Sequence, residues 1–270
     1  SFQPGAREIV EIILAHADRV RAVSFGRGPD GDMIARFRAA GIICMPTVGA
    51  LKHAQKMVAL GCNAVTVQGG EGGGHTGAVA TTVLLPQVLD SVSVPVIAAG
   101  GFADGRGLAG ALAYGAAGIA MGSRFMMTSD SPVPDAIKAA YAKAGTDDIF
   151  VTKKVDGLPQ RMIANPMLAK IERGGAMAKW RRGMLAGLTM KRETGASWAD
   201  MLRAAKGMTS HGGLSLPEAM LAAAAPVLIQ KAVVHGDAKG GLMASGLVAG
   251  RLSDLPSCAE LCAQIETDTR

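Results

Sequence analysis

The sequence predicts an α/β protein of the (β/α)8 TIM-barrel class, with helical segments added after the barrel. Three observations support this class. Short apolar segments alternate with helical stretches through the first half of the chain, and glycine follows several of these segments directly. Aromatic residues make up only 4% of the 270 residues, which suits helices packed closely over a sheet. Alternation of this kind is typical of parallel βα units.

Five apolar segments predict the strands of this barrel. Their residues are apolar at successive positions, as expected where helices or a barrel interior cover both faces of a sheet. The predicted strands are Val20–Gly26, Ile42–Val48, Ala64–Gly69, Val94–Gly100 and Ile119–Phe125. The predicted helices around them are Ala6–His16, Asp32–Ala40, Ala50–Leu60 and Gly107–Tyr114.

A closed barrel of this class needs eight strands, and five are visible. The chain opens with Ser1 and enters a helical stretch almost at once. We therefore expect the first βα units of the natural barrel to precede this numbering. An open, doubly wound sheet of five strands is the alternative.

The pattern changes after Phe125. Residues 126–175 contain four prolines and a double glycine, and residues 176–270 read as mostly helical. The predicted division is therefore residues 1–150 as the C-terminal part of a barrel, and residues 151–270 as a helical insert or lid with closing helices.

The net charge of +6 arises in one stretch, residues 170–192, which carries seven basic residues and one acidic residue. This stretch is either a solvated helical face or a site for a phosphate-rich ligand such as coenzyme A, with Arg181 and Arg182 as candidate phosphate ligands. The scarcity of aromatic residues argues against nucleic-acid binding, which usually needs stacking side chains.

The four cysteines predict neither disulfides nor a metal site. Cys44 and Cys62 lie in or beside apolar strands and read as buried thiols. Cys258 and Cys262 are four apart on a predicted helix, but no histidine or second cysteine pair accompanies them. We expect a reducing, cytoplasmic setting. The sequence has no signal peptide and no apolar run of about 18 residues, so we expect no membrane span.

A glycine-rich loop follows the third predicted strand. Six of the ten residues from Gln68 to Gly77 are glycine. Active sites of barrels lie in the loops after the strands, and so many glycines indicate close approach of the backbone to a flat ligand. The candidate lining residues are Gln68, Gly69, Gly73 and Gly74. His75 lies in the same loop and is the candidate general acid/base, because imidazole titrates near neutrality.

The next two strands end in glycine as well, at Ala99-Gly100-Gly101 and at Met121-Gly122-Ser123. Consecutive glycines let backbone N–H groups converge on an anion, and the helix after Gly101, with Asp104 as its expected N-cap, adds partial positive charge. If the barrel is complete in nature, these are strands seven and eight, where barrel phosphate sites commonly form. We therefore predict a phosphate site here.

These segments resemble the nitronate monooxygenase family. The loop Gln68–Gly77 is similar to that family's Gly-Gly-His loop, and Val94–Leu108 and Gly122–Phe125 are similar to its flavin-phosphate segments. The resemblance implies a TIM barrel, FMN and a catalytic role for His75. It also implies that the flavin is lined by Gln68, Gly100, Gly101, Gly122 and Ser123. The sequence departs from the family at Gly72, where alanine is usual, and at Ser123, where threonine is usual.

Three functions stay open at this point, two within the resemblance and one outside it. The first is oxidation of a nitronate or related carbanion by FMN and O2. The second is NAD(P)H-dependent reduction of an acyl thioester of coenzyme A or a carrier protein, because Phe125–Asp135 and residues 170–192 resemble a subgroup that acts on coenzyme A esters in steroid-ring breakdown. The third is a phosphate-binding barrel without flavin. The expected partner is a small molecule, and a homo-oligomer stays open.

Overall fold

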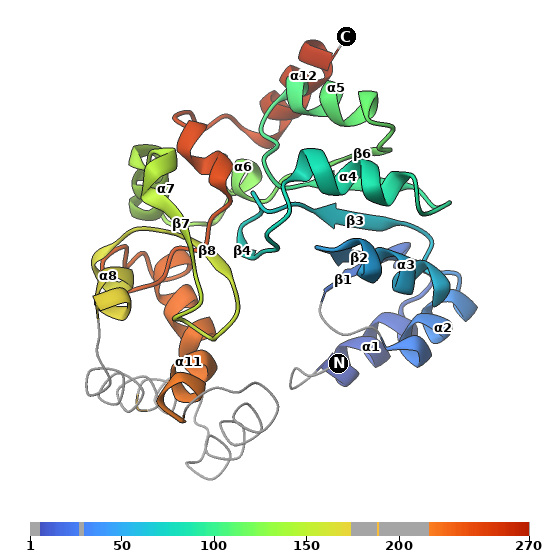
Figure 1. Ribbon diagram of the computed structural model, residues 1–270, viewed down its shortest axis with the longest axis horizontal. Helices are drawn as coiled ribbons and strands as arrows, with labels where there is room; N and C mark the ends of the chain where they lie inside the picture. Colours follow the sequence, from blue (N-terminus) through green and yellow to red (C-terminus); the bar gives the residue numbers. More distant parts are fainter. Residues whose placement is uncertain (1–5, 27–29, 174–187, 189–215, 270) are drawn as a thin grey trace. The chain divides into compact units, whose positions relative to one another are not determined.

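The computed structural model describes residues 6–26, 30–173, 188 and 216–269 (Figure 1). The chain divides into two compact units. The first consists of residues 1–72, 76–121 and 261–270, and the second of residues 73–75 and 122–260. The first holds a parallel sheet and the second an antiparallel one. The boundary predicted at residue 150 falls inside the second unit and stays a prediction.

The sheet of the first unit has five parallel strands in the order β1-β2-β3-β5-β6. Strand order follows chain order, which is the arrangement of consecutive βα units. The strands are β1 (Ala22–Phe25), β2 (Ile43–Val48), β3 (Val65–Gln68), β5 (Val96–Ala99) and β6 (Gly118–Ala120). Four predicted strands are thus confirmed with shorter ends.

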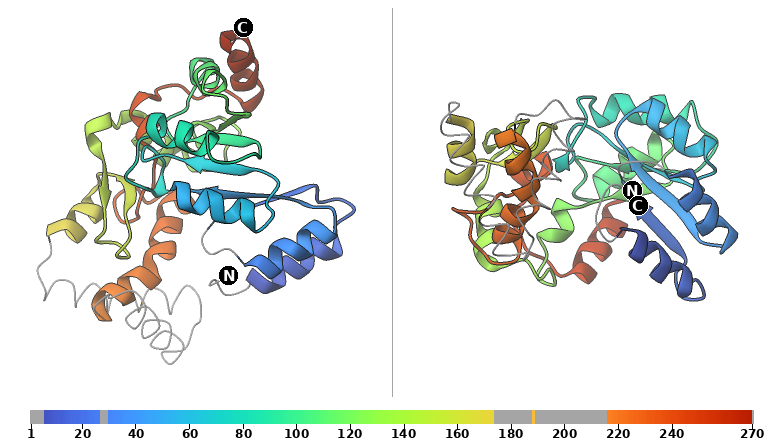
Figure 2. Two further views of the ribbon diagram at one scale, coloured as in Figure 1. Left: turned by 45° about the vertical axis from the view of Figure 1, so that its right-hand side comes forward. Right: turned by 90° about the horizontal axis from the view of Figure 1, so that it is seen from below.

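Helices lie along this sheet, as the two views of Figure 2 show for α3 beside β2. They are α1 (Ala6–Ala15), α2 (Gly31–Ala39), α3 (Leu51–Ala59), α4 (Thr81–Leu89) and α5 (Gly105–Ala113). Their buried side chains form one core with the strands, in which Phe37, Leu84 and Val67 are almost fully enclosed. Cys44 and Cys62 are buried free thiols, as predicted, and burial raises the pKa of Cys62 to about 11.

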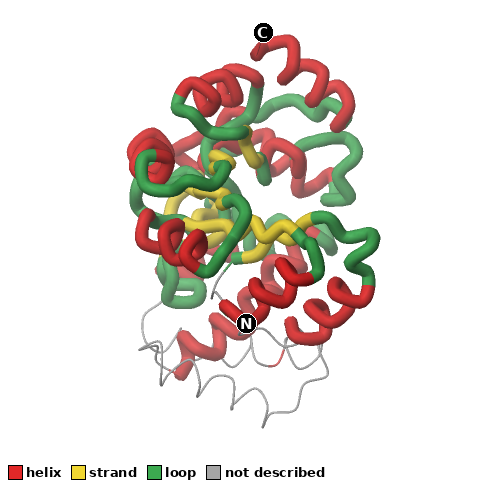
Figure 3. Tube along the Cα trace, turned by 90° about the vertical axis from the view of Figure 1, so that its right-hand side faces the viewer, coloured by secondary structure: helices red, strands yellow, loops and turns green. Residues whose placement is uncertain are grey.

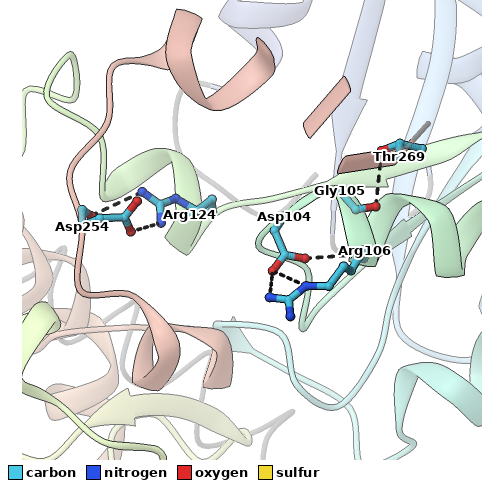
Figure 4. Close-up of polar contacts among 7 residues, drawn as sticks. Asp104, Gly105, Arg106, Arg124, Asp254 and Thr269 are labelled. Atoms are coloured by element: carbon cyan, nitrogen blue, oxygen red, sulfur yellow. Dashed lines mark hydrogen bonds and ion pairs between the residues drawn. The ribbon is translucent and has the colours of Figure 1, made fainter. Parts of the chain in front are cut away.

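The C-terminal helix α12 (Cys258–Thr269) packs against the start of α5. Thr269 Oγ1 donates a hydrogen bond to the carbonyl of Gly105 at 3.3 Å (Figure 4). A Cβ atom at Gly105 would overlap Asp268, so glycine is needed for this close approach. Cys258 and Cys262 lie on α12 as predicted, and the described part of the chain contains no group of three or more side chains that could hold a metal ion.

The second unit is built around a three-stranded antiparallel sheet in the order β4-β8-β7. Its strands are β4 (Gly74–His75), β7 (Ile149–Thr152) and β8 (Gln160–Ile163). The helices α8 (Pro166–Arg173) and α11 (Leu216–Val233) pack against the β7–β8 hairpin (Figure 1). Figure 3 distinguishes the helices, strands and loops along the trace. Their shared core contains Val155, Met162, Leu168, Ile171 and Leu228.

Four short elements complete the described part of this unit, three before the β7–β8 hairpin and one after α11. They are α6 (Ser123–Met126), α7 (Asp135–Lys143) and the 3-10 helices η1 (Thr146–Asp148) and η2 (Leu247–Arg251). The Arg124 guanidinium is buried and donates to Asp254 Oδ1 at 2.7 Å (Figure 4). It also donates to the Met127 carbonyl at 2.9 Å. The ion pair joins Asp254, whose side chain is exposed, to α6, although the two residues lie 130 positions apart in the sequence.

Two expectations need correction. The strand predicted at Ile119–Phe125 is wrong beyond Ala120, because Ser123–Met126 is a turn of helix. The second half of the chain contains the β7–β8 hairpin, where no strand was expected. Among the described residues, no helix is both long enough and apolar enough to cross a membrane.

Candidate functional site

The first half of the glycine loop is packed tightly inside the first unit. Gly69 donates its N–H to the Ala99 carbonyl at 3.0 Å, which joins the loop to the end of β5. A Cβ atom at Gly69 would overlap Thr81, and one at Gly72 would lie 2.5 Å from the Gln68 side chain. Gly69 is therefore required by the protein's own packing, whereas a side chain at Gly72 would require only that the Gln68 side chain move. Contact of Gln68 and Gly69 with a flavin stays a prediction.

Glu71 anchors this part of the loop to helix α4. Its carboxylate accepts hydrogen bonds from Thr81 N at 2.9 Å and from Thr81 Oγ1 at 2.6 Å. Thr81 opens α4, and the N-cap residue Ala80 has no side chain that could accept such a bond. The Glu71 carboxylate therefore satisfies a helix N–H that would otherwise lack a protein partner, and its negative charge suits the positive end of the helix.

The end of β5 has the backbone expected for an anion site. Gly100 and Gly101 have φ values of +93° and +88°, which other residues rarely adopt. A Cβ atom at Gly100 would lie 3.0 Å from Gly72 N, so the strand end and the glycine loop are in close contact. Asp104 caps α5 as predicted, accepting from Gly107 N at 3.2 Å, and also pairs with Arg106 (Figure 4). Two glycines of this conformation before a helix N-terminus fit a phosphate.

Gly122 and Ser123 offer a second segment for the same kind of ligand, within the second unit. Gly122 has φ −89°, and no described atom lies within 4 Å of the position that a Cβ would occupy. The backbone conformation of Gly122 is open to any residue, and no described neighbour would clash with a side chain there. The absence of a side chain at this position therefore suits the close approach of a ligand. Ser123 Oγ accepts from Gly246 N at 2.9 Å, and a hydroxyl that accepts still carries a proton to donate.

The second half of the glycine loop belongs to the antiparallel sheet of the second unit. Gly74 and His75 pair with Arg161 and Gln160 of β8. A Cβ atom at Gly73 would lie 2.5 Å from Gly246 N, so the loop is in close contact with the backbone of Ser245 and Gly246. The strand pairing fixes the backbone of His75, which leaves its side chain to be oriented by its neighbours.

Asp156 and Gln160 orient the imidazole of His75. Asp156 Oδ2 lies 2.6 Å from His75 Nε2, and Gln160 Nε2 lies 3.0 Å from the same atom. The other oxygen of Asp156 accepts from Leu158 N at 3.1 Å, in the turn between β7 and β8. Burial raises the pKa of the Asp156 carboxyl, but the hydrogen bonds from His75 and Leu158 N–H outweigh burial, so the net pKa is lowered. Asp156 is therefore a carboxylate at neutral pH.

Sequence reasoning missed both partners of His75. The Asp156-Gly157 dipeptide between two short alternating segments is a hairpin signal that could have indicated the turn. The pairing of that turn with residue 75, 81 positions earlier, has no local signal. Gly100, Gly101, Gly122 and Ser123 lie where the predicted strand ends were expected, and Ala99 and Met121 directly precede them. Arg181 and Arg182 lie outside the described residues.

Two solved structures share this fold over nearly the whole chain. FabK from Thermotoga maritima matches with a TM-score of 0.75 and 29% identity, over 99% of this chain and 73% of that chain. A nitroalkane oxidase from Streptomyces ansochromogenes matches with a TM-score of 0.71 and 25% identity, over 98% of this chain and 68% of that chain. Both are TIM barrels, so the predicted fold class is confirmed.

Similarity to two dehydrogenases of assigned activity extends over almost the whole chain. A (3aS,4S,5R,7aS)-5-hydroxy-7a-methyl-1-oxo-octahydro-1H-indene-4-carboxyl-CoA dehydrogenase from Mycobacterium tuberculosis is 47% identical, over 97% of this chain and 74% of that protein. The protein of the same name from Rhodococcus jostii is 45% identical, over 93% of this chain and 71% of that protein. A probable nitronate monooxygenase from Staphylococcus saprophyticus is 34% identical, over 56% of this chain and 46% of that protein.

The model of the nitronate monooxygenase family matches residues 3–268, almost the full length of the sequence. The relatives named above and the solved structures agree with this match. The chain therefore belongs to the nitronate monooxygenase family and is an FMN-dependent oxidoreductase of that type.

Proposed function

We propose that this protein dehydrogenates the coenzyme A ester of a hydroxylated bicyclic carboxylic acid, with FMN as the electron acceptor. The proposal rests mainly on how much of this chain aligns with the two coenzyme A ester dehydrogenases, which is 97% and 93% of its length. The nitronate monooxygenase named above matches over 56%. The direction proposed is oxidation, whereas the thioester alternative raised from the sequence was a reduction.

Each residue group has a proposed task. His75 is the general acid/base, because its imidazole is oriented by a carboxylate and lies in the loop after β3. Gly100, Gly101 and the N-terminus of α5 would hold the flavin phosphate, and Gly122 and Ser123 are a second flavin-binding segment. Bound FMN would supply a two-electron acceptor. We further propose that Arg181 and Arg182 contact the phosphates of coenzyme A.

Oxidation of a nitronate is the second candidate function. It is favoured by the 25% identity and TM-score of 0.71 to a nitroalkane oxidase. A flavin-free phosphate barrel, the third function raised from the sequence, does not fit membership in a family of FMN enzymes.

Steady-state turnover separates the two candidates. The purified holoenzyme is assayed with the coenzyme A ester of a hydroxylated hydroindane carboxylic acid, with the corresponding free acid and with the nitronate of nitropropionate. NAD(P)+ and O2 are tested in turn as final electron acceptor. We expect the highest kcat/KM for the ester and a poor one for the free acid. A nitronate that is turned over with O2 while the ester is inactive would replace the first proposal with the second.

A further inference from the structure

Thr81, the first residue of α4, links the glycine loop to the end of β5. Its N–H and its hydroxyl both contact the Glu71 carboxylate, at 2.9 and 2.6 Å. The same hydroxyl lies 3.0 Å from the carbonyl oxygen of Gly100. Thr81 is only 6% exposed, and a Cβ atom at Gly69 would overlap both its backbone and its hydroxyl. Packing and hydrogen bonds together therefore hold this side chain in one place.

The Thr81 hydroxyl has one hydrogen and two acceptors within reach, the Glu71 carboxylate and the Gly100 carbonyl. The Thr81 N–H binds the carboxylate independently, so the residue stays attached to Glu71 when the hydroxyl hydrogen turns to Gly100. Among the described residues, Thr81 is the one donor to this carbonyl. Glu71 therefore places Thr81, and Thr81 places the carbonyl at the strand end.

The direction of the Gly100 carbonyl determines the direction of the Gly101 N–H. Both groups belong to one planar trans peptide, in which the C=O and the N–H point in opposite directions. A carbonyl directed at Thr81 therefore directs the Gly101 N–H away from α4. Gly101 is exposed, and its N–H has no acceptor within the part of the chain that the structure describes. This N–H is available to an anion, as expected for two consecutive glycines of this conformation.

A peptide between two glycines needs such a restraint to keep its orientation. Glycine has no Cβ, so the torsions on either side of the Gly100–Gly101 peptide can rotate at little steric cost. Rotation would turn the carbonyl oxygen toward the anion, and the partial negative charge of that oxygen repels a phosphate. The hydrogen bond from Thr81 opposes this rotation, because the carbonyl would lose its donor.

We infer that Thr81 and Glu71 are positioning residues for the flavin phosphate. This inference rests on the proposed function, which assigns the phosphate to Gly100 and Gly101. Glu71 holds Thr81, and Thr81 holds the peptide between the two glycines. The Gly101 N–H is thereby directed to the phosphate site before the flavin binds, which lowers the cost of ordering the backbone on binding. Both side chains act through the backbone of the strand end, so neither is a catalytic residue.

The Thr81→Val variant tests this inference, because valine keeps the branched shape and lacks the hydroxyl. The full chain is titrated with FMN and with riboflavin, which has no phosphate, and binding is followed by flavin fluorescence. We expect the Kd for FMN to rise by about 10-fold, the usual contribution of one hydrogen bond, and the Kd for riboflavin to stay unchanged. Glu71→Ala should weaken FMN binding as well, whereas Thr81→Ser keeps the hydroxyl and should bind FMN like the native protein. Thr82→Val is the matched control, since Thr82 is exposed beside Thr81 in α4.

The outcomes separate the inference from the assignment of the phosphate site. An equal rise in both Kd values would mean that Thr81 only supports the fold, and unchanged FMN binding in Thr81→Val or Glu71→Ala would mean that these side chains do not orient the peptide; either result overturns the inference. Thr81→Ala, which also lacks the hydroxyl, gives the same comparison if the valine variant does not fold. Gly101→Ala tests the assignment itself, because a side chain is strained at φ +88°.

If Gly101→Ala weakens the binding of FMN alone while Thr81→Val does not, the phosphate assignment stands and the inference fails. A native protein that binds FMN no better than riboflavin overturns the phosphate assignment together with the inference.

Discussion

Residues of the glycine loop differ in why they are glycine. Gly69 and Gly73 are required because the backbone of another part of the chain occupies the space of a side chain, whereas Gly74 is required by its φ of +63° and has no atom within 4 Å of its Cβ position. The sequence indicated one common cause, a flat ligand. The contacts that distinguish the glycines, with Thr81 and Gly246, come from distant positions and leave no local signal.

Alanine substitutions at two adjacent positions test this distinction. We expect Gly74→Ala to lower the free energy of unfolding by about 1 kcal/mol, the cost of a left-handed backbone. Gly73→Ala should cost about 3 kcal/mol, because the new methyl group meets the backbone of Ser245 and Gly246. Urea unfolding of the two variants measures the difference. Equal costs would contradict the packing described at Gly73.

The charge of Asp156 also makes a stability contribution that depends on pH. Its folded-state pKa is lowered from a usual value near 3.8, so the folded protein holds the proton less tightly than the unfolded chain. The resulting stability is present above that usual value and is lost as the pH falls through the folded-state pKa. We expect Asp156→Asn to be less stable than the native protein at pH 7, and the difference to disappear in acid. Denaturant titrations at several pH values measure this difference, and a difference that does not change with pH would contradict this account.

Helices and strands that a local sequence pattern marks were predicted well. Elements that depend on contacts with residues far away in the sequence were not. The strands at Ile43–Val48 and Val96–Ala99 are apolar runs flanked by helical stretches, so pattern alone located them. Helix α4 was missed, and the structure shows why: Ala80 offers no cap, Pro86 lies inside the helix, and the cap is Glu71, ten residues earlier. The first turn after β6 is helical because Ser123 and Arg124 are tied to Gly246 and Asp254.

Helix α5 tests the importance of a cap beside the phosphate segment. Asp104→Ala removes the acceptor for Gly107 N, and we expect a loss of about 1 kcal/mol in stability. Flavin affinity should fall as well, because the N–H groups at the start of α5 would be less well ordered. Arg106→Ala is the control, since the Arg106 side chain is 75% exposed and its pairing with Asp104 should contribute little. A chemical unfolding curve with flavin titration would show both effects; equal changes in the two variants would argue against the cap.

For the whole molecule, the family and fold class could be predicted because the motifs lie in consecutive βα units, where order in the sequence determines order in the sheet. The substrate could not be predicted in this way, because the fold supports several chemistries. Asp156 belongs to a hairpin in the second unit, and the basic stretch 170–192 lies largely outside the described residues. We therefore expect the choice among substrates to depend on parts of the chain that follow the predicted strands.

The basic stretch 170–192 gives a prediction about how positive charge affects substrate binding. Replacing Arg181 and Arg182 with glutamine should raise KM for a coenzyme A ester and leave KM for a nitronate unchanged, since only the ester carries several phosphate charges. Replacing the exposed Arg19 and Arg21 with glutamine removes the same charge elsewhere and should leave both values unchanged. Initial rates at two salt concentrations provide the measurement. An equal rise in both KM values would rule out phosphate recognition by this pair.

The central claim of the proposed function is that His75, in the glycine loop after β3, carries out proton transfer, while the glycine-marked ends of β5 and β6 bind the flavin. Anaerobic mixing of the His75→Ala holoenzyme with the hydroxyacyl coenzyme A ester tests it most directly, with bound flavin followed by its visible absorbance. We expect the variant to be isolated with a full complement of FMN and its flavin to be reduced about 100-fold more slowly than in the native protein, or slower still. A variant that retains its flavin and is reduced at the native rate would contradict the claim.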